Sequence, residues 1–196
     1  MGADAEVLDR KSAVPALIGD PADFLIIGGL AGTARDIAHL TGDGDNAFLL
    51  GGAMGAAVSV GLGLALTQPG RRVLVATGDG ELLMGLGALG TVGVMAPANL
   101  SILCVDNGHY QETGGQPSHT SLGVDLAAIA QGCGIPNIHG VATSDEIGAA
   151  AMALRAANGP VFVLLKVGMA APPATRRSFD AAARKSAFRQ ALLGAP

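Results

Sequence analysis

The sequence predicts an α/β fold, a three-layer α/β/α domain built around a mainly parallel, doubly wound sheet. Short aliphatic runs alternate with Ala- and Gly-rich segments along the chain, and this alternation is typical of βαβ units. The strand-like runs are apolar throughout rather than at every second residue, as expected for strands buried on both faces. A length of 196 residues suits one domain with a sizeable core.

Six segments have the composition of strands. They are short, rich in Ile, Val, Leu and Phe, and mostly bordered by glycine, proline or asparagine. The expected strands are 23–29, 46–51, 71–77, 100–106, 137–141 and 159–168.

Helices are expected between these strands, where alanine, glycine and leucine dominate. The expected helices are 33–41, 53–67, 81–94, 124–132 and 145–158. The segment 68–70, Gln-Pro-Gly, ends the second of them, because proline and glycine do not continue a helix. Ser144 is expected to cap the last one, and 107–120 is expected to be a turn-rich loop.

The chain is interpreted as a single domain over residues 1–196, with a distinct segment at each end. Residues 1–12 are polar and acidic, and contain no signal peptide, so a cytoplasmic location is expected. The segment 174–196 follows two prolines and is basic. Its residues 175–193 are amphipathic, which predicts a helix packed on the domain or on a neighbouring chain.

Composition excludes several classes of protein. Only 14% of residues are charged and 49% are hydrophobic, so a partner is expected to cover part of the surface. The net charge is −4 and no basic run exceeds two residues, which argues against nucleic acid. Cys104 and Cys133 have no metal-ligand spacing. The uncharged stretches 46–70 and 82–105 are rich in glycine and divide into strand and helix, so no membrane span is expected.

Polar side chains follow two successive strands at the points where they end. Asp79 follows one strand, and Asp106 and Asn107 end the next. A single crossover helix separates the two strands, so they can be neighbours about 4.8 Å apart, with Asp79 and Asn107 reaching a common point. Carboxylate and amide oxygens suit Mg²⁺ or Ca²⁺, and Mg²⁺ shares its coordination sphere with phosphates.

Glycine around the acid also suits a phosphate ligand. Gly78 and Gly80 let the backbone approach a ligand closely, and the helix expected to begin near Glu81 would direct free N–H groups to the same place. The pattern therefore predicts a metal-bridged diphosphate at this edge of the sheet.

These residues resemble the motif of thiamine-diphosphate enzymes, in which Gly-Asp-Gly is followed by an Asn-Asn pair. The resemblance implies that the metal ligands are Asp79, Asn107 and the backbone carbonyl of His109. Asp106 departs from the motif, in which this first position of the pair is asparagine and is not a ligand. The resemblance therefore implies thiamine diphosphate and Mg²⁺ as cofactors.

A second segment, 51–55 with the sequence Gly-Gly-Ala-Met-Gly, resembles the part of the family that holds the aminopyrimidine ring. The resemblance implies that the Gly52 carbonyl and the Met54 N–H bond the ring, and that the Met54 side chain keeps the cofactor bent. The full implied cofactor set is Gly52, Ala53, Met54, Gly78, Asp79, Gly80, Glu81, Asn107, His109 and Tyr110.

The chain is similar to this family over roughly 23–168, and within it to the β subunits of sulfopyruvate and phosphonopyruvate decarboxylases. The loop 106–121 and the end of the tail carry the closer similarity. Such enzymes need a glutamate against the pyrimidine, and none of Glu6, Glu81, Glu112 or Glu146 has its context. The resemblance thus implies a pyrimidine-binding α subunit that supplies the glutamate, an α₂β₂ assembly, and a small anionic 2-keto acid as substrate.

Three side chains are candidates for contact with substrate. His109, Glu112 and His119 lie in the loop after the metal ligand, and histidine transfers protons near neutral pH. Three other functions stay open. They are the β subunit of a 2-keto acid:ferredoxin oxidoreductase, a carboligase subunit similar to acetolactate synthases, and an α/β nucleotide-binding or interaction module without chemistry.

Overall fold

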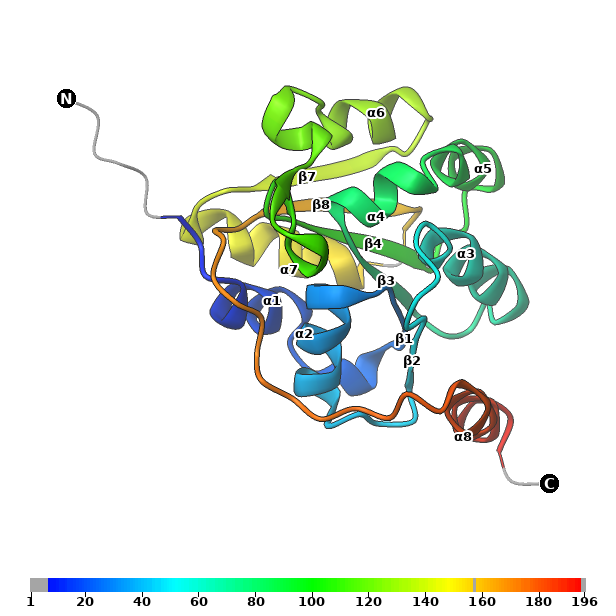
Figure 1. The fold of residues 1–196 in the computed structure, drawn as a ribbon. Coiled ribbons are helices and arrows are strands. Elements are labelled where there is room, and N and C mark those ends of the chain that lie inside the picture. Colours follow the sequence, from blue (N-terminus) through cyan, green and yellow to red (C-terminus); the bar gives the residue numbers. More distant parts are fainter. Residues whose placement is uncertain (1–6, 157, 195–196) are drawn as a thin grey trace.

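The computed structural model describes residues 7–156 and 158–194, and its centre is a six-stranded parallel sheet (Figure 1). The strand order is β2-β1-β3-β4-β8-β7, and every pairing between neighbours is parallel. The strands are β1 Leu25–Gly28, β2 Ala47–Leu49, β3 Val73–Gly78, β4 Leu100–Asp106, β7 Asn137–Val141 and β8 Val161–Lys166. All six expected strands are therefore confirmed, and β3 and β4 are direct neighbours.

Helices cover both faces of the sheet, which confirms the three-layer α/β/α class (Figure 1). One face carries α1 Arg10–Ile18, α2 Ala31–Thr41 and α7 Ile147–Arg155. The other carries α3 Ala57–Thr67, α4 Asp79–Met84, α5 Gly87–Met95 and α6 Leu126–Gly132. The last helix, α8 Ala181–Leu193, packs beside the edge strand β2. Short 3-10 helices occupy 21–23, 111–113, 119–122 and 144–146.

The core consists of two apolar layers separated by the sheet. Successive residues of a strand point to opposite faces, so Val73 and Val75 of β3 join one layer while Leu74 and Ala76 join the other. All four are completely buried. This double burial explains why the strands are apolar without alternation.

Two expected helices differ from the structure because two glycines meet. The helix expected over 53–67 begins only at Ala57, and the one expected over 81–94 is divided into α4 and α5. A Cβ built on Gly85 would lie 2.0 Å from the Gly55 carbonyl oxygen, so the two backbones touch where both helices are interrupted. A tertiary contact of this kind leaves no periodic signal in either segment.

The structure also corrects the ends of other elements. Thr143, not Ser144, precedes the turn that leads into α7, and the Glu146 carboxylate accepts from the Thr143 N–H at 3.0 Å. The loop expected over 107–120 contains a small antiparallel hairpin, β5 His109–Tyr110 with β6 Gln116–Pro117.

Both terminal segments pack on the rest of the domain, although their polar composition suggests exposed chain ends. Residues 1–6 lie outside the described residues, but the rest of the polar segment 1–12 leads into α1, whose first residue Arg10 is buried. The predicted tail helix forms as α8. The Phe188 ring lies 5.9 Å from Phe48 of β2, and Arg184 contacts Asp45 at 3.1 Å.

Among the helices of the described residues, none combines the length and the apolar character needed to cross a bilayer.

Candidate functional site

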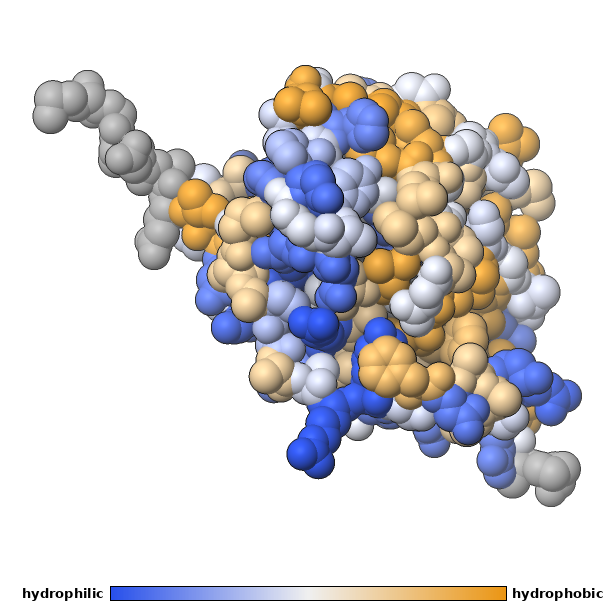
Figure 2. Space-filling view, viewed as in Figure 1, coloured by the Kyte–Doolittle hydropathy of each residue, from blue (hydrophilic) through white to orange (hydrophobic). Residues whose placement is uncertain are grey.

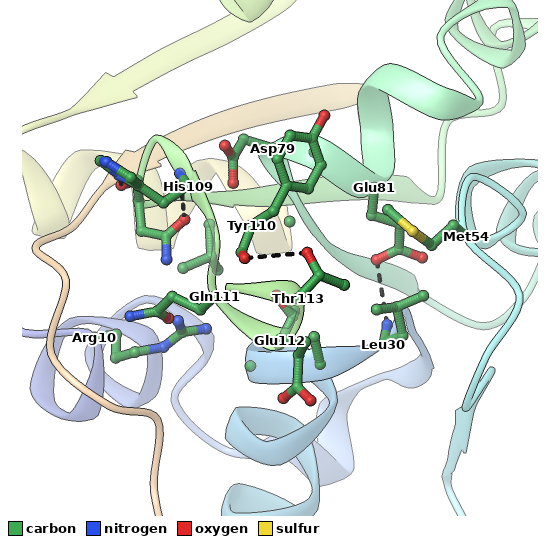
Figure 3. Close-up of a pocket in the computed structure, with 17 residues that line it drawn as sticks. Arg10, Leu30, Met54, Asp79, Glu81, His109, Tyr110, Gln111, Glu112 and Thr113 are labelled. Atoms are coloured by element: carbon green, nitrogen blue, oxygen red, sulfur yellow. Dashed lines mark hydrogen bonds between the residues drawn. The ribbon is translucent and has the colours of Figure 1, made fainter. Parts of the chain in front are cut away.

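A cleft opens where the sheet changes its winding direction. The chain moves outward from β1 to β2 and then returns past β1 to form β3, so the carboxyl ends of β1 and β3 border a crevice. Several segments meet there: α1, the loop from β1 into α2, the turn before α3, the end of β3 with α4, and the loop after β4 (Figure 3). The lining residues are Arg10, Leu30–Thr33, Met54, Gly78–Glu81, Val105, Asn107 and His109–Thr113.

Asp79 anchors a buried hydrogen-bonded group on one side of the cleft. Its side chain is 3% exposed, and its Oδ2 accepts from the Ser118 hydroxyl and, at 3.3 Å, from Thr120. Burial raises the pKa of Asp79, and the nearby charge of Asp106 raises it further, against the Ser118 hydrogen bond. A divalent cation at this carboxylate would relieve the unfavourable burial of negative charge.

Asp106 is the residue that departs from the family motif, and its negative charge is compensated by a lysine of the neighbouring strand. It is the register partner of Lys166 on β8, and the Lys166 ammonium contacts its Oδ2 at 2.5 Å. Its Oδ1 accepts from the Thr120 hydroxyl at 2.7 Å and from the Gly108 N–H at 2.9 Å. Asp106 is therefore directed to the lysine and the loop, which is consistent with a position that is not a ligand.

Asn107 and His109 form a tight turn directly after β4. The Asn107 Oδ1 accepts from the His109 N–H at 3.1 Å, and the imidazole Nδ1 lies 2.9 Å from the Asn107 carbonyl oxygen. Gly108 adopts a φ of 70°, the left-handed conformation that glycine tolerates best. Both residues line the same cleft as Asp79, and Figure 3 shows His109 near this carboxylate.

The glycines of the Gly-Asp-Gly segment have different surroundings. A Cβ on Gly80 would lie 2.1 Å from the ring of Tyr110, so only glycine lets this ring pack on α4. A Cβ on Gly78 would meet nothing nearer than 3.6 Å, so the backbone there is open to a ligand. Both residues line the cleft, as the sequence predicts.

Glu81 is buried on the opposite wall, near Met54 (Figure 3). Its Oε2 accepts from the Leu30 N–H at 3.3 Å, whereas Oε1 is the one buried side-chain polar atom without a hydrogen-bond partner among the described residues. Burial raises the pKa of this carboxyl. A Cβ on Gly29 would lie 1.7 Å from Oε2, so the glycine directly after β1 makes room for the carboxylate.

Arg10 is a cleft residue that the sequence analysis missed. Its side chain is 4% exposed, and its Nε and Nη2 form a two-point ion pair with Asp36 of α2, the shortest contact being 2.5 Å. The guanidinium lies against Gly32, where a Cβ would approach Nη1 to 2.8 Å. Arg10 therefore places a fixed positive charge at the cleft wall formed by the start of α2.

The N-cap residue Leu30 and the first turn of α2, Ala31–Thr33, form a second part of the cleft that was missed. The pair Gly28-Gly29 at the end of a strand is a sequence signal for close approach of a ligand to the backbone. Ligands of open α/β sheets bind at the carboxyl ends of strands where the strand order reverses, and this rule would have predicted a binding segment after β1.

The turn 51–55 lies at the other end of the cleft and is open to solvent. Met54 lines the cleft and is 37% exposed, while Gly52 and Ala53 are exposed and do not line it. Gly51 and Gly55 have φ values of 67° and 82°. The turn thus presents its backbone outward, beside the protruding methionine.

The structure separates the three candidates for substrate contact. His109 and Glu112 line the cleft, and Glu112 forms an ion pair with Arg35 at 3.0 Å. His119 is exposed and does not line it, although its neighbours Ser118 and Thr120 both bond Asp79. His119 is therefore not part of the cleft wall formed by this chain.

Comparison with known proteins identifies the family. Residues 46–165 match the model of the thiamine pyrophosphate enzyme C-terminal TPP-binding domain, and the chain belongs to this family. It is 40% identical to phosphonopyruvate decarboxylase of Streptomyces viridochromogenes over 81% of this chain and 39% of that protein. It is 40% identical to sulfopyruvate decarboxylase subunit beta of Methanothermobacter thermautotrophicus over 65% of this chain and 68% of that protein.

Solved structures agree with the fold. Benzoylformate decarboxylase from Polynucleobacter necessarius superposes with a TM-score of 0.69 at 17% identity, over 89% of this chain and 36% of that one. The chain spans about two fifths of the length of the phosphonopyruvate decarboxylases that it matches. It therefore corresponds to the TPP-binding part of such larger proteins.

The cleft fits thiamine diphosphate with Mg²⁺. One end offers the hard oxygen donors of Asp79, Asn107 and the His109 backbone, which suit Mg²⁺. The open backbone at Gly78 and the buried guanidinium of Arg10 suit a diphosphate. Met54 stands at the far end, where the rings would follow.

Proposed function

We propose that this chain is the Mg²⁺- and thiamine-diphosphate-binding subunit of a 2-keto acid decarboxylase of the sulfopyruvate or phosphonopyruvate type. The observation that carries the proposal is the continuity of one cleft from Asp79 and Asn107, at two adjacent strand ends, to the Met54 turn. The relatives support the class of substrate, because both kinds are named as decarboxylases of 2-keto acids with a strongly acidic tail.

Each end of the cleft has a separate task in this proposal. Asp79, Asn107 and the His109 carbonyl hold the metal, and Gly78, Gly80 and Arg10 surround the diphosphate. Met54 and the backbone of Gly52 orient the rings. When bound, the cofactor supplies the carbanion equivalent and the electron sink for loss of CO₂. In this proposal His109, which lines the cleft, transfers a proton there.

A partner chain completes the site in this proposal. Apolar side chains gather on the side of the molecule that carries α3, α4 and α5 (Figure 2). The exposed Met54 turn leads into α3. The exposed residues on that side of the molecule are Val60, Leu66, Met84, Val94 and Met95. An exposed patch of this kind marks an interface. The relatives named subunit beta suggest an α subunit as its occupant, and an α₂β₂ assembly is the expected form.

The test is purification of the tagged chain from its native host, followed by assay of whatever co-purifies. The expected result is a stoichiometric partner and Mg²⁺-dependent release of CO₂ from sulfopyruvate or phosphonopyruvate, with an aldehyde as product. CO₂ release that requires an electron acceptor would instead support the ferredoxin oxidoreductase, and a ligated product the carboligase. A complex that binds no thiamine diphosphate would contradict the proposal.

A pair of surface variants tests the interface itself. Val94→Lys places a charge on α5, at a side chain that is 84% exposed, and is expected to reduce recovery of the partner by about tenfold. Met152→Lys is the matched control, because Met152 is 72% exposed but lies on α7, on the other face of the sheet. Equal recovery with both variants would place the partner elsewhere.

A further inference from the structure

A second cavity adjoins the cofactor cleft on the side of the C-terminal segment. It lies between the start of α2, Gly51 of the turn 51–55 and the stretch 172–179, which belongs to the connection from β8 to α8. Leu30, Ala31 and Glu112 line both cavities, so the two spaces meet at these residues. The remaining lining residues are Arg35, Gly51, Pro172–Thr175, Arg177 and Phe179.

Two guanidinium groups from distant parts of the chain converge on this cavity. Arg35 comes from α2 and Arg177 from the connecting stretch before α8. Partial burial lowers the pKa of Arg177, and the positive charge of Arg35 lowers it further, against Asp43 and Glu112, which raise it. Two like charges held near one another are unfavourable unless an anion joins them.

Among the described residues, the acids near the cavity form an ion pair with only one of the two arginines, Arg35. Glu112 pairs with Arg35 at 3.0 Å, but the two side chains are 44% and 46% exposed, so this pair contributes little and is easily exchanged. Asp43 binds the Ser178 N–H and lies 3.9 Å from Arg184. Within the described residues no carboxylate forms an ion pair with Arg177, whose guanidinium lies over the Phe179 ring at 4.3 Å.

The position of the cavity indicates what kind of anion it would take. Gly51 belongs to the same turn as Met54, and Glu112 follows the loop of the metal ligands. A group bound here is therefore beside the place where the rings of the cofactor are expected. Guanidinium pairs are suited to oxyanions with several acceptor oxygens, such as a sulfonate or a phosphonate.

We propose that Arg35 and Arg177 bind the distal acidic group of the 2-keto acid substrate, which displaces Glu112 from Arg35. This inference rests on the proposed function and names the residues that select the substrate class. The 2-keto group then faces the cofactor cleft across Leu30 and Ala31, while the tail stays in the arginine cavity. Arg35 and Arg177 are specificity residues in this arrangement and take no part in proton transfer.

The experiment uses the complex purified from the native host and compares substrates with and without an acidic tail. Arg177→Gln and Arg35→Gln are assayed with sulfopyruvate, phosphonopyruvate and pyruvate. Each is expected to raise KM for the acidic-tailed substrates about 10-fold or more, with kcat and the values for pyruvate little changed, because a charge-assisted hydrogen bond is lost. Arg176→Gln is the matched control, since Arg176 is the adjacent arginine but does not line the cavity.

A binding measurement separates this inference from the proposed function. Calorimetric titration of the complex with phosphonoacetate, a non-reacting acidic analogue, is expected to show binding that Arg177→Gln weakens and Arg176→Gln does not. Inorganic phosphate and sulfate are titrated in parallel, and equal affinity for them would reveal a free-anion site and overturn the role in substrate binding. Equal losses for pyruvate, or for Arg176→Gln, would also overturn it. A complex that decarboxylates no 2-keto acid but keeps Arg177-dependent phosphonoacetate binding would remove the function and leave the anion site.

Discussion

The two ends of the cofactor cleft differ in how complete they are. At the strand ends, Asp79, Asp106 and Arg10 are each buried, and each has partners from this chain. At the turn 51–55, by contrast, Gly52 and Met54 are exposed, and the turn leads directly into α3, which carries the exposed Val60. The end proposed to hold the metal and the diphosphate is thus organised within the chain, whereas the end proposed to hold the rings is exposed at the surface.

This difference separates the contacts that stabilise this chain by itself from the contacts that form only when it associates with another chain. Buried charges tolerate no loss of their partners, because an uncompensated charge in the interior is costly. Exposed apolar residues tolerate substitution in the isolated chain and matter on association. Substitutions at the strand-end region should therefore change stability or ligand affinity of this chain, while substitutions on the α5 surface should change only assembly.

The largest effect is expected when the ion pair of Arg10 is broken. Arg10→Met leaves the Asp36 carboxylate, which is 2% exposed, without its partner, and should lower the free energy of unfolding by about 3–5 kcal/mol. Denaturant unfolding of the purified chain measures it. The double variant Arg10→Met/Asp36→Leu replaces the pair by apolar groups and should recover most of the loss. No recovery would show that Arg10 stabilises the fold through other contacts.

The second largest effect is expected on ligand affinity. Asp79→Asn keeps the shape of the side chain but removes the charge proposed to bind Mg²⁺. It should weaken Mg²⁺-dependent binding of thiamine diphosphate about 100-fold or more, because loss of a residue that only supports a metal ligand already costs about 10–100-fold. Calorimetry or fluorescence titration measures the affinity. Asp45→Asn, an exposed acid beside Arg184, is the control and should bind normally. Undiminished binding to Asp79→Asn would contradict the assigned metal site.

Much of this strand-end region was predictable because its signals are local. The buried strands are continuous apolar runs, and Gly78, Asp79 and Asn107 stand directly at strand ends. The single crossover helix between β3 and β4 allows these strands to be neighbours, and the structure shows that they are. The sheet, its layers and the convergence of these residues on one cleft could therefore be inferred from sequence.

The parts that could not be predicted depend on contacts between distant segments. Arg10 stands in a segment that is polar in composition, and only its pairing with Asp36 carries it into the interior. The interruptions before α3 and between α4 and α5 come from the contact of Gly55 with Gly85. Arg177 reaches the cofactor region because the connecting stretch passes over α2. None of these leaves a periodic pattern in its own segment.

A smaller effect is expected from the hydroxyl that supports Asp79. Ser118 is completely buried, and its hydroxyl donates to the Asp79 carboxylate. Ser118→Ala should leave the proposed metal ligands in place but loosen the orientation of Asp79, and is expected to weaken Mg²⁺ affinity about 10-fold. The same titration detects this change. The control is Ser121→Ala in the same loop, where the native hydroxyl donates to the Ser118 carbonyl, and this variant should bind Mg²⁺ as the native chain does.

The smallest effect is the pH dependence of stability, which has opposite signs for the carboxylates of Glu81 and Glu146. Burial raises the pKa of Glu81 in the folded chain, so the folded state holds this proton more tightly than the unfolded state. The resulting stabilisation is complete below the unfolded pKa, about 4.3, and is lost as pH rises through the raised value. The ionised carboxylate thus opposes folding at neutral pH, and Glu81→Gln should raise Tm of the ligand-free chain at pH 7.5 by about 2–4 °C.

Glu146 supplies the opposite case for the same measurement. The Ala142 and Thr143 N–H groups donate to its carboxylate and lower its pKa, so its contribution is present above the unfolded pKa and is lost as pH falls. Thermal melts of Glu81→Gln and Glu146→Gln between pH 4 and 8 should therefore diverge toward neutral pH, the first above and the second below the native chain. Parallel curves for the two variants would show that the buried Glu81 is not penalised by its surroundings.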